Sequence, residues 1–464
     1  MSPGSDAPIS ATGMPATGLI IAAAASGSGK TTLTLGLLRL FARQGLAVRG
    51  CKIGPDYIDP AFHAAASGAA CFNLDAWAMR ETSLSSVVAA TQPHDLLIVE
   101  GVMGLFDGAA MVSDSSTSQA PDLAAGSTAQ LAAKAGWPVV LVLNVKGQGA
   151  TAAAVAKGLL QFHKDVRVAG VICNNVGSPR HGEILRHAFR QAGIPLLGLV
   201  PRVSSLHLPD RHLGLVQAGE HVDLENFLNA AADHLAQHVD IAALRAVAGQ
   251  SIDSLQQEAS AAALLPPLGQ HIAVATDIAF AFAYPAQLRA WRNAGAVLSS
   301  FSPLQDETPD AAADAIFLPG GYPELHASRL AANSRFIAGL RQAAADGKVI
   351  YGECGGYMML GRSLTDADGQ AHAMLDLLPV ETSFAQRKLH LGYRQIRQLC
   401  ATPFGRTETL LRGHEFHYAS VVAQAAGDRL FSVTDAAGRD LGAYGHHRGS
   451  VFGSYLHLID LADR

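Results

Sequence analysis

The chain has 464 residues, of which 49 % are hydrophobic and 16 % charged, and its formal net charge is −5 at pH 7. This length exceeds one ordinary hydrophobic core, so two domains of roughly 200 residues each are expected. The acidic balance argues against a nucleic-acid partner, because phosphate binding needs a concentrated basic face. No apolar run approaches the roughly 20 residues that a membrane helix needs, so no membrane span is predicted.

From residue 17, short β-rich runs alternate with amphipathic stretches, which predicts strands joined by helical crossovers. Such strands form a parallel sheet covered by helices on both faces. The alternating pattern stops over residues 246–269, where the sequence is poor in β-branched residues and ends in a proline pair. A second alternating series follows it. We therefore predict an α/β protein with domains at 17–245 and 270–464 and a linker between them.

Residues 26–32 carry a loop of the phosphate-binding type, "SGSGKTT", between an apolar strand and the periodic run "LTLGLLRL". Strand, glycine loop and helix are the context that a P-loop requires. The backbone amides and a lysine can neutralise phosphate oxygens, and a hydroxyl can bind Mg²⁺. The first consensus glycine is replaced by Ala24, and an ordinary Gly-Ser turn is the alternative. The predicted ATP-binding residues are Ser26, Gly27, Ser28, Gly29, Lys30, Thr31 and Thr32.

Acidic residues follow two other predicted strands. Glu100 ends "LLIVEG", while Asp56 and Asp59 follow "KIG" in "GPDYIDP". Carboxylates at strand ends beside a P-loop can hold the magnesium of a nucleotide for phosphoryl transfer. The predicted metal ligands are Thr31, Asp56 and Glu100. The alternative is that these carboxylates form turns and helix caps.

The second domain contains "KVIYGECGGYMML", which places Cys354 between a strand and a helical stretch. Flanking glycines and a helix N-terminus are typical of a nucleophile elbow, although a buried structural thiol is the alternative. His457 in "GSYLHLID" is the predicted base, and Gly320, Gly321 and Gly355 are predicted to form the oxyanion and glutamine site. "HEFHY" at 414–418 departs from H-E-x-x-H, so we do not interpret it as a metal site.

The remaining cysteines have no such setting, and the five together form no C-x-x-C pair. This argues against a disulfide framework or zinc site and favours a reducing compartment. Residues 1–15 lack the charged start and apolar core of a secretory signal, so a cytoplasmic protein is predicted. The other four cysteines are Cys51, Cys71, Cys173 and Cys400.

Several motifs in one order together resemble the cobyrinic acid a,c-diamide synthase family, and the resemblance runs from about residue 17 to the end. "LPDRHLGLVQAGEH" and "HEFHYA" resemble the aerobic branch of that family. The resemblance implies an N-terminal ATP-using domain similar to dethiobiotin synthetase, fused to a class I glutamine amidotransferase domain of the cobalamin-pathway type. The motifs are "ASGSGKTT", "GPDYIDPAFH", "VEGVMGLFDG", "LPGGYPELH", "YGECGGYMML" and "GSYLHLID".

The resemblance implies a carbon–nitrogen ligase that amidates the a and c acetate groups of hydrogenobyrinic acid through acyl phosphates. ATP with Mg²⁺ supplies the energy and glutamine supplies the ammonia. Asn174 then occupies an adenine-reading position, unless it only caps the next turn. Candidates for corrinoid handling are Tyr57, Asp59, Arg211 and His212, with solvated loop charge as an equal alternative. We also expect the protein to form a homodimer.

One position departs from the usual class I pattern, in which a glutamate two residues after the catalytic histidine orients it. That position is Ile459, which leaves the orienting partner of His457 unidentified. The same reaction on cobalt-containing cobyrinic acid or nickel sirohydrochlorin, and a cobyric acid synthase, are alternatives. A partitioning-type ATPase switch with a silent C-terminal module is a further one. Ala25, where that switch carries a lysine, and the Cys354–His457 pair argue against it.

Overall fold

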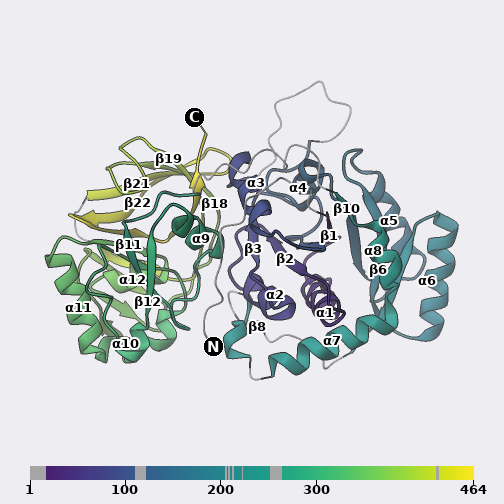
Figure 1. The fold of residues 1–464 in the computed structure, drawn as a ribbon, viewed down its shortest axis with the longest axis horizontal. Helices are drawn as coiled ribbons and strands as arrows, with labels where there is room; N and C mark the ends of the chain where they lie inside the picture. The colour runs from purple at the N-terminus through teal and green to yellow at the C-terminus, as the bar shows by residue number, and fades with distance from the viewer. Residues whose placement is uncertain are drawn as a thin grey trace.

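The computed structural model describes residues 17–109, 122–203, 206, 210–211, 214–221, 223–250, 264–424 and 428–463. Two α/β halves lie side by side, and the purple-to-teal half in Figure 1 is the N-terminal one. No helix among these residues is long and apolar enough to cross a membrane.

The N-terminal half is built on a sheet of parallel strands, as predicted. β1 lies between β4 and β5 at the point where the strand order reverses, and ligands of open α/β sheets bind at such a point beyond the carboxyl ends of the strands. The strands in spatial order are β3 (Phe72–Leu74), β2 (Val48–Ile53), β4 (Leu96–Glu100), β1 (Thr17–Ala23), β5 (Val139–Asn144), β6 (Val168–Val176) and β7 (Leu196–Pro201).

Helices cover both faces of this sheet because its strands are apolar on both sides. Leu19, Ile21 and Ala23 face one group of helices, and Ile20 and Ala22 face the other. The first group is α1 (Lys30–Arg43), α2 (Asp59–Ser67), α7 (Leu224–His238) and α8 (Ile241–Val247). The second group is α3 (Glu81–Ala90), α4 (Thr128–Ala135), α5 (Thr151–Gln161) and α6 (Pro179–Ala192).

The described parts of the predicted linker pack against the two halves. β10 (Gly249–Gln250) pairs antiparallel with the start of β1. On the other side, Leu265 is buried and its carbonyl accepts a hydrogen bond from Trp291 of the second half at 3.1 Å. Residues 251–263 lie outside the described residues, so the boundaries of the linker stay a prediction.

The C-terminal half contains a mixed sheet whose parallel part carries the thiol loop. The parallel strands are β12 (Val297–Phe301), β11 (His271–Ala275), β13 (Ala315–Leu318), β14 (Val349–Glu353) and β23 (Val451–Ser454). The sheet continues through antiparallel pairs, namely β22 (Asp440–Arg448), β21 (Asp428–Asp435), β18 (His390–Gln398), β19 (Leu410–His417) and β24 (Leu456–Leu461).

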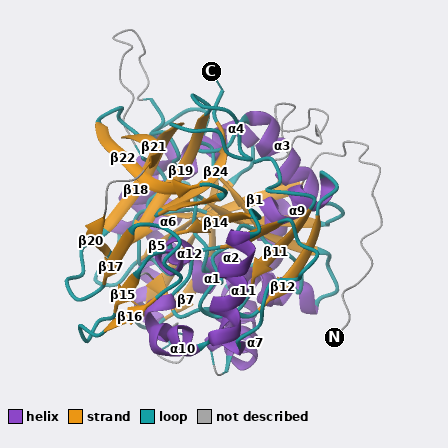
Figure 2. Ribbon diagram, turned by 90° about the vertical axis from the view of Figure 1, so that its left-hand side faces the viewer, coloured by secondary structure: helices purple, strands orange, loops and turns teal. Residues whose placement is uncertain are grey.

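A small second sheet and the helices of this half complete the described residues, and the side view shows where they lie (Figure 2). Its strands are β16 (Ala371–Ala373), β15 (Ser363–Thr365), β17 (Val380–Ser383) and β20 (Ser420–Gln424). The helices are α9 (Pro285–Asn293), α10 (Ala327–Ala332), α11 (Ser334–Ala345) and α12 (Gly355–Leu360).

The two halves share a packed interface formed by β18, β19 and β24 against the segment that follows β3. Asp460 accepts hydrogen bonds from the backbone and guanidinium of Arg80, at 2.8 Å and 2.7 Å. The ring of Tyr393 lies 4.6 Å from that of Trp77. Ile459 is 2 % exposed and packs into the core of the N-terminal half. An apolar residue therefore occupies the class I glutamate position because this strand is part of the interface.

Candidate active sites

The phosphate loop lies between β1 and α1, as the motif predicted. Gly27 and Gly29 have φ angles of 72° and 90°, in the region that favours glycine. A Cβ on Gly29 would come within 2.2 Å of the Asn174 side chain, so the loop also needs glycine for space. Lys30 begins the helix, and its amine donates to the Met103 carbonyl at 2.6 Å. Burial lowers the pKa of Lys30, which Glu100 opposes.

Glu100, at the end of β4, is the centre of a buried polar network beside the loop. Its Oε1 accepts from the Thr31 hydroxyl at 2.7 Å and from Lys52 at 2.9 Å. Its Oε2 lies 2.6 Å from Nε2 of His63. Burial by itself would raise the pKa of Glu100, but Lys52 and His63 bring it well below its usual value. An ionised carboxylate is thus held ready next to the hydroxyl of the P-loop.

The two aspartates of the next loop differ in their roles. Asp56 accepts hydrogen bonds from the backbone amides of Ile58 and Asp59 at 2.7 and 3.1 Å. These bonds close a turn, which is the alternative role that the sequence left open for Asp56. Asp59 forms a buried ion pair with Lys52. Burial and the charge of Asp56 raise the pKa of Asp59 to about 7, against the effect of Lys52. Thr31, Asp56 and Glu100 offer the hydroxyl and carboxylate oxygens that Mg²⁺ prefers.

A cavity of about 190 Å³ opens beside the phosphate loop. Its walls include Gly29 and Thr32 of the P-loop together with Asn174 and His234. The Asn174 amide donates to the carbonyl of Ser28 at 2.9 Å, so this side chain braces the loop at the edge of the cavity. The role of Asn174 in reading adenine stays a prediction.

Two predicted substrate residues have no described side chain. Arg211 lies in the short strand β8 (Asp210–Arg211), which pairs with β9 (Gly214–Leu215). His212 lies outside the described residues. Their predicted roles stay predictions.

Cys354 lies at a sharp turn between β14 and α12. Its φ angle is 46°, a strained value for a residue with a side chain and one typical of a nucleophile elbow. A Cβ on Gly356 would come within 1.9 Å of the Leu318 carbonyl, so the turn needs a glycine there. The thiol residue is 4 % exposed, and burial raises its pKa well above the usual value, with the charge of Glu324 adding to the effect.

His457 projects from β24 toward this elbow and is 1 % exposed. A Cβ on Gly320 would come within 2.5 Å of the imidazole Cε1 and 3.4 Å of the Cys354 Cβ. A Cβ on Gly355 would lie 3.1 Å from the amide nitrogen of Gly321. The structure therefore brings together all five residues that the sequence predicts for the thiol site.

Tyr57 of the N-terminal half packs directly on this site in the other half. Its ring lies 4.6 Å from that of His457, and it stacks on Tyr284 at 4.4 Å. The Tyr284 hydroxyl donates to the carbonyl of Pro55 at 3.2 Å. The segment 54–59 thus carries Asp59 at the phosphate site and Tyr57 at the thiol site, so one short loop touches both.

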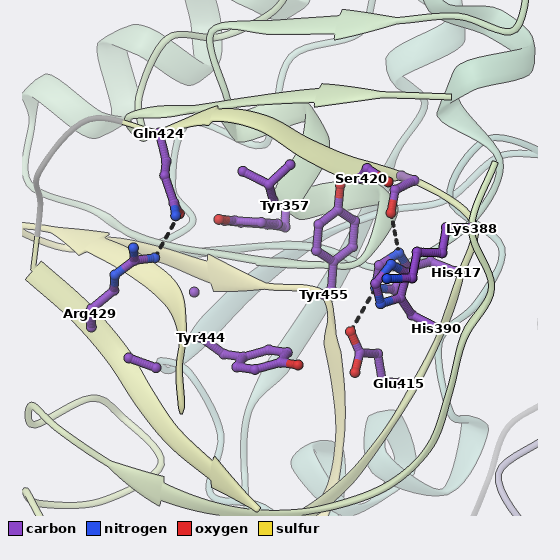
Figure 3. A pocket seen from close by; sticks show the side chains of 14 residues that line it. Tyr357, Lys388, His390, Glu415, His417, Ser420, Gln424, Arg429, Tyr444 and Tyr455 are labelled. Carbon is purple, nitrogen blue, oxygen red and sulfur yellow. Dashed lines mark hydrogen bonds and ion pairs between the residues drawn. The ribbon is translucent and has the colours of Figure 1, made fainter. Parts of the chain in front are cut away.

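A cavity of about 320 Å³ lies next to the elbow, and Figure 3 shows its lining. Tyr357, three residues after the thiol, and Tyr455 form part of its wall. The remaining walls carry charged and polar groups from β18 to β22 and the segments beside them. These are Lys388, His390, Glu415, His417, Ser420, Gln424, Arg429 and Tyr444.

The polar wall of this cavity has a net positive character. Arg394 binds Oε2 of Glu415 through two nitrogens, at 2.9 and 2.7 Å, and His417 lies 2.8 Å from Oε1. Ligand atoms of His390, Glu415 and His417 lie within 4.8 Å of one another. However, the carboxylate is already neutralised and Lys388 lines the same space, so the cavity suits a ligand with its own carboxylate better than a metal cation.

Sequence analysis missed the residues that surround the predicted ones. Lys52 interrupts the buried strand β2, and a charged residue in such a strand was a visible signal of a buried site. His63 lies inside the quoted motif "GPDYIDPAFH" and was not assigned. His390 meets His417 only through the pairing of β18 with β19, their rings stacked at 4.7 Å, and no local pattern reveals that pairing.

The fold and the two sites define a two-domain amidotransferase with a nucleotide-binding half. A family model described as the CobQ/CobB/MinD/ParA nucleotide binding domain matches residues 19–216, and one described as a CobB/CobQ-like glutamine amidotransferase domain matches residues 271–464. Both confirm the predicted fold class.

Two relatives identify the family more closely. The hydrogenobyrinate a,c-diamide synthase of Brucella anthropi is 54 % identical over 448 residues, which cover 96 % of this chain and 98 % of the relative. The protein of the same name from Rhodobacter capsulatus is 51 % identical over 95 % of this chain and 98 % of its own. The chain belongs to the hydrogenobyrinate a,c-diamide synthase family, which confirms the resemblance found in its motifs.

Proposed function

We propose that the chain is an ATP-dependent, glutamine-hydrolysing ligase that amidates the a and c acetate groups of hydrogenobyrinic acid. The observation that carries the proposal is the loop 54–59, which joins a phosphate site to a thiol site. A carboxylate needs activation before nitrogen can replace its oxygen, and glutamine needs a nucleophile to release its nitrogen. The two sites supply one function each.

The N-terminal half activates the acid. Lys30 and the loop amides bind the phosphates, and the substrate carboxylate attacks the γ-phosphorus to give an acyl phosphate and ADP. Magnesium, when bound, offsets the negative charge of the phosphates. Thr31, Glu100 and Asp56 would hold it, while Lys52 and His63 keep Glu100 ionised.

The C-terminal half releases ammonia. His457 accepts the Cys354 proton, and the thiolate attacks the side-chain amide of glutamine. Backbone amides around Gly320, Gly321 and Gly355 stabilise the oxyanion that forms. The nitrogen leaves as ammonia with the proton from the imidazolium, and water then hydrolyses the thioester to glutamate.

The cavity of Figure 3 suits the amino-acid end of glutamine. Lys388 can bind its α-carboxylate, and Glu415 at the same end of the cavity can accept from its α-ammonium group, while Arg429 lies at the opposite end. The side-chain amide then extends past Tyr455 toward the elbow. Tyr455 follows Ser454, whose carbonyl accepts from the Cys354 amide at 2.9 Å.

The shared loop accounts for transfer between the sites. Ammonia must reach the acyl phosphate before protonation makes it unreactive, so a path shielded from water is needed. Tyr57, Phe282 and Tyr284 form an aromatic wall beside His457 on the side of the N-terminal half. We place the path along this wall, with the corrinoid carboxylate close to Asp59, and the roles of Arg211 and His212 toward the corrinoid stay predictions.

The identity of the tetrapyrrole is the part of the proposal that rests on the relatives' printed name. The test supplies purified enzyme with ATP, Mg²⁺, glutamine and either hydrogenobyrinic acid or its cobalt-containing counterpart. The proposal predicts two successive amidations of the metal-free acid, seen by mass, with one ADP formed for each. Preference for the cobalt form would overturn the substrate, and turnover without ADP would overturn the reaction.

The proposal also includes the compartment of the protein and its oligomeric state. A reaction that consumes ATP and glutamine fits the cytoplasm, and the predicted cysteine chemistry fits its reducing state. The homodimer stays a prediction, and sedimentation of the purified protein tests it.

A further inference from the structure

His457 needs a group that fixes its ring and balances the positive charge it gains on accepting a proton. The class I position for that group is Ile459, which is buried in the interface between the halves. Nδ1 of His457 is itself buried and has no hydrogen-bond partner among the described residues. A buried polar atom without a partner points to an interaction that forms during the reaction.

Glu353 is the acidic residue that faces this atom. It ends β14 and directly precedes Cys354, so the backbone that presents the nucleophile also presents this carboxylate. Its Oε2 lies 3.8 Å from Nδ1 of His457.

Two hydrogen bonds anchor Glu353, and both use its other oxygen. Oε1 accepts from the Tyr351 hydroxyl at 2.7 Å and from the backbone amide of Leu458 at 3.1 Å. The second bond ties the carboxylate to the residue that follows His457. Oε2 is therefore held toward the imidazole. Its distance is longer than a hydrogen bond, as is common for acid–base partners in unliganded sites.

We propose that Glu353 is the positioning residue of the thiol site and replaces the glutamate that other class I enzymes carry two residues after the histidine. The inference rests on the proposed function. When the Cys354 proton moves to His457, a neutral thiol and imidazole become a thiolate and an imidazolium. Glu353 then stabilises that imidazolium, and the proton leaves with the ammonia.

The other groups that face His457 cannot balance its charge. Burial raises the pKa of Tyr57 well above its usual value, so this phenol stays neutral. Burial, together with the positive charges of His457, Arg394 and His417, lowers the pKa of His414 well below its usual value, so this imidazole stays neutral too. Glu415, beside His414 on β19, is already bound to Arg394. Glu324 acts on the thiol, since its charge adds to the raised pKa of Cys354, whereas Glu353 is the carboxylate that lies 3.8 Å from the imidazole.

The decisive variant is Glu353→Gln, because its amide oxygen can still accept from Tyr351 and Leu458 while the charge is lost. We expect kcat for glutamine hydrolysis to fall about 100-fold with KM nearly unchanged. Because the charge of Glu353 also raises the pKa of the Cys354 thiol, alkylation of Cys354 by iodoacetamide should reach half its maximal rate at a lower pH, although kcat falls. Glu353→Asp should recover part of both effects. Amidation with added ammonium should stay at the wild-type rate.

Two results would overturn the inference. One is a Glu353→Gln enzyme with wild-type kcat and an unchanged alkylation profile. The other is equal loss of glutamine- and ammonium-dependent amidation with a lower melting temperature, which would make Glu353 merely structural. Tyr351→Phe is the matched control, because it removes one anchor and keeps the charge, and its alkylation profile should stay close to the wild type. If wild-type enzyme releases no glutamate at all, the proposed function fails, whereas the alkylation profiles still test Glu353.

Discussion

The phosphate site and the thiol site differ in how their charges are arranged before any substrate binds. At the phosphate site, Glu100 is ionised, and both its oxygens are bound by Thr31, Lys52 and His63. At the thiol site, burial keeps Cys354 protonated, and Nδ1 of His457 has no hydrogen-bond partner among the described residues. The phosphate site is charged before its ligand binds. The thiol site becomes charged only when glutamine reacts, because the Cys354 proton then moves to His457.

The largest effect should come from Lys52→Met, which leaves the carboxylates of Glu100 and Asp59 buried without their cation. We expect a loss of about 3–5 kcal/mol in the free energy of unfolding and no amidation with either nitrogen donor. Denaturant melts and ADP release measure the two effects. Arg43→Met, which removes an exposed ion pair with Asp233, is the control and should change stability by less than about 1 kcal/mol. Wild-type stability of Lys52→Met would contradict the network.

Gly320→Ala tests the thiol site alone. Its added Cβ would meet the imidazole of His457 at 2.5 Å and displace it, so glutamine hydrolysis should fall about 100-fold. Amidation with ammonium should continue, because the phosphate site is untouched. Gly158→Ala is a matched control on α5, where a Cβ meets nothing within 4 Å. Parallel loss with both nitrogen donors would show that the sites are not separate.

Tyr57→Ala should weaken the contact between the two sites. Loss of the ring from beside His457 opens the aromatic wall, so ammonia should escape and the ratio of glutamate formed to amide formed should rise several-fold above one. Measuring both products from the same reaction gives this ratio. Tyr57→Phe keeps the ring and should keep the wild-type ratio. An unchanged ratio for Tyr57→Ala would place the path elsewhere.

The smallest effect is a pH dependence in the free enzyme. The pKa of the Cys354 thiol is raised by burial, so the reactive thiolate is scarce at pH 7 and its fraction grows as pH rises. Alkylation by iodoacetamide should therefore be slow at neutral pH and accelerate toward pH 10. The exposed fraction of Cys400 is larger, and mass spectrometry of the labelled peptides separates the two thiols. Fast, pH-independent labelling of Cys354 would contradict a protonated resting state.

The amino-acid sequence predicts those residues of both sites that lie in or next to a glycine-rich loop. The P-loop and the elbow are such loops, because the steric demand for Gly29 and Gly356 is local and leaves a readable pattern. The fold class follows from alternating strands and helices for the same reason.

The partners of those loops could not be predicted, because they come from distant segments. The contact of Tyr57 with His457 is one example, since only the arrangement of the two halves brings residues 400 positions apart together. Glu353 directly precedes the nucleophile in the sequence. Its direction toward the imidazole depends on the anchors at Tyr351 and Leu458, which periodicity does not reveal.

The separation of the two chemistries is tested most directly with Cys354→Ala. The variant is given ATP, Mg²⁺ and hydrogenobyrinic acid with either glutamine or ammonium chloride, and product masses and ADP are followed together. Ammonium should yield the diamide with ADP at close to the wild-type rate, while glutamine should yield no amide. Failure with both donors, or amide formed from glutamine without the thiol, would contradict the account.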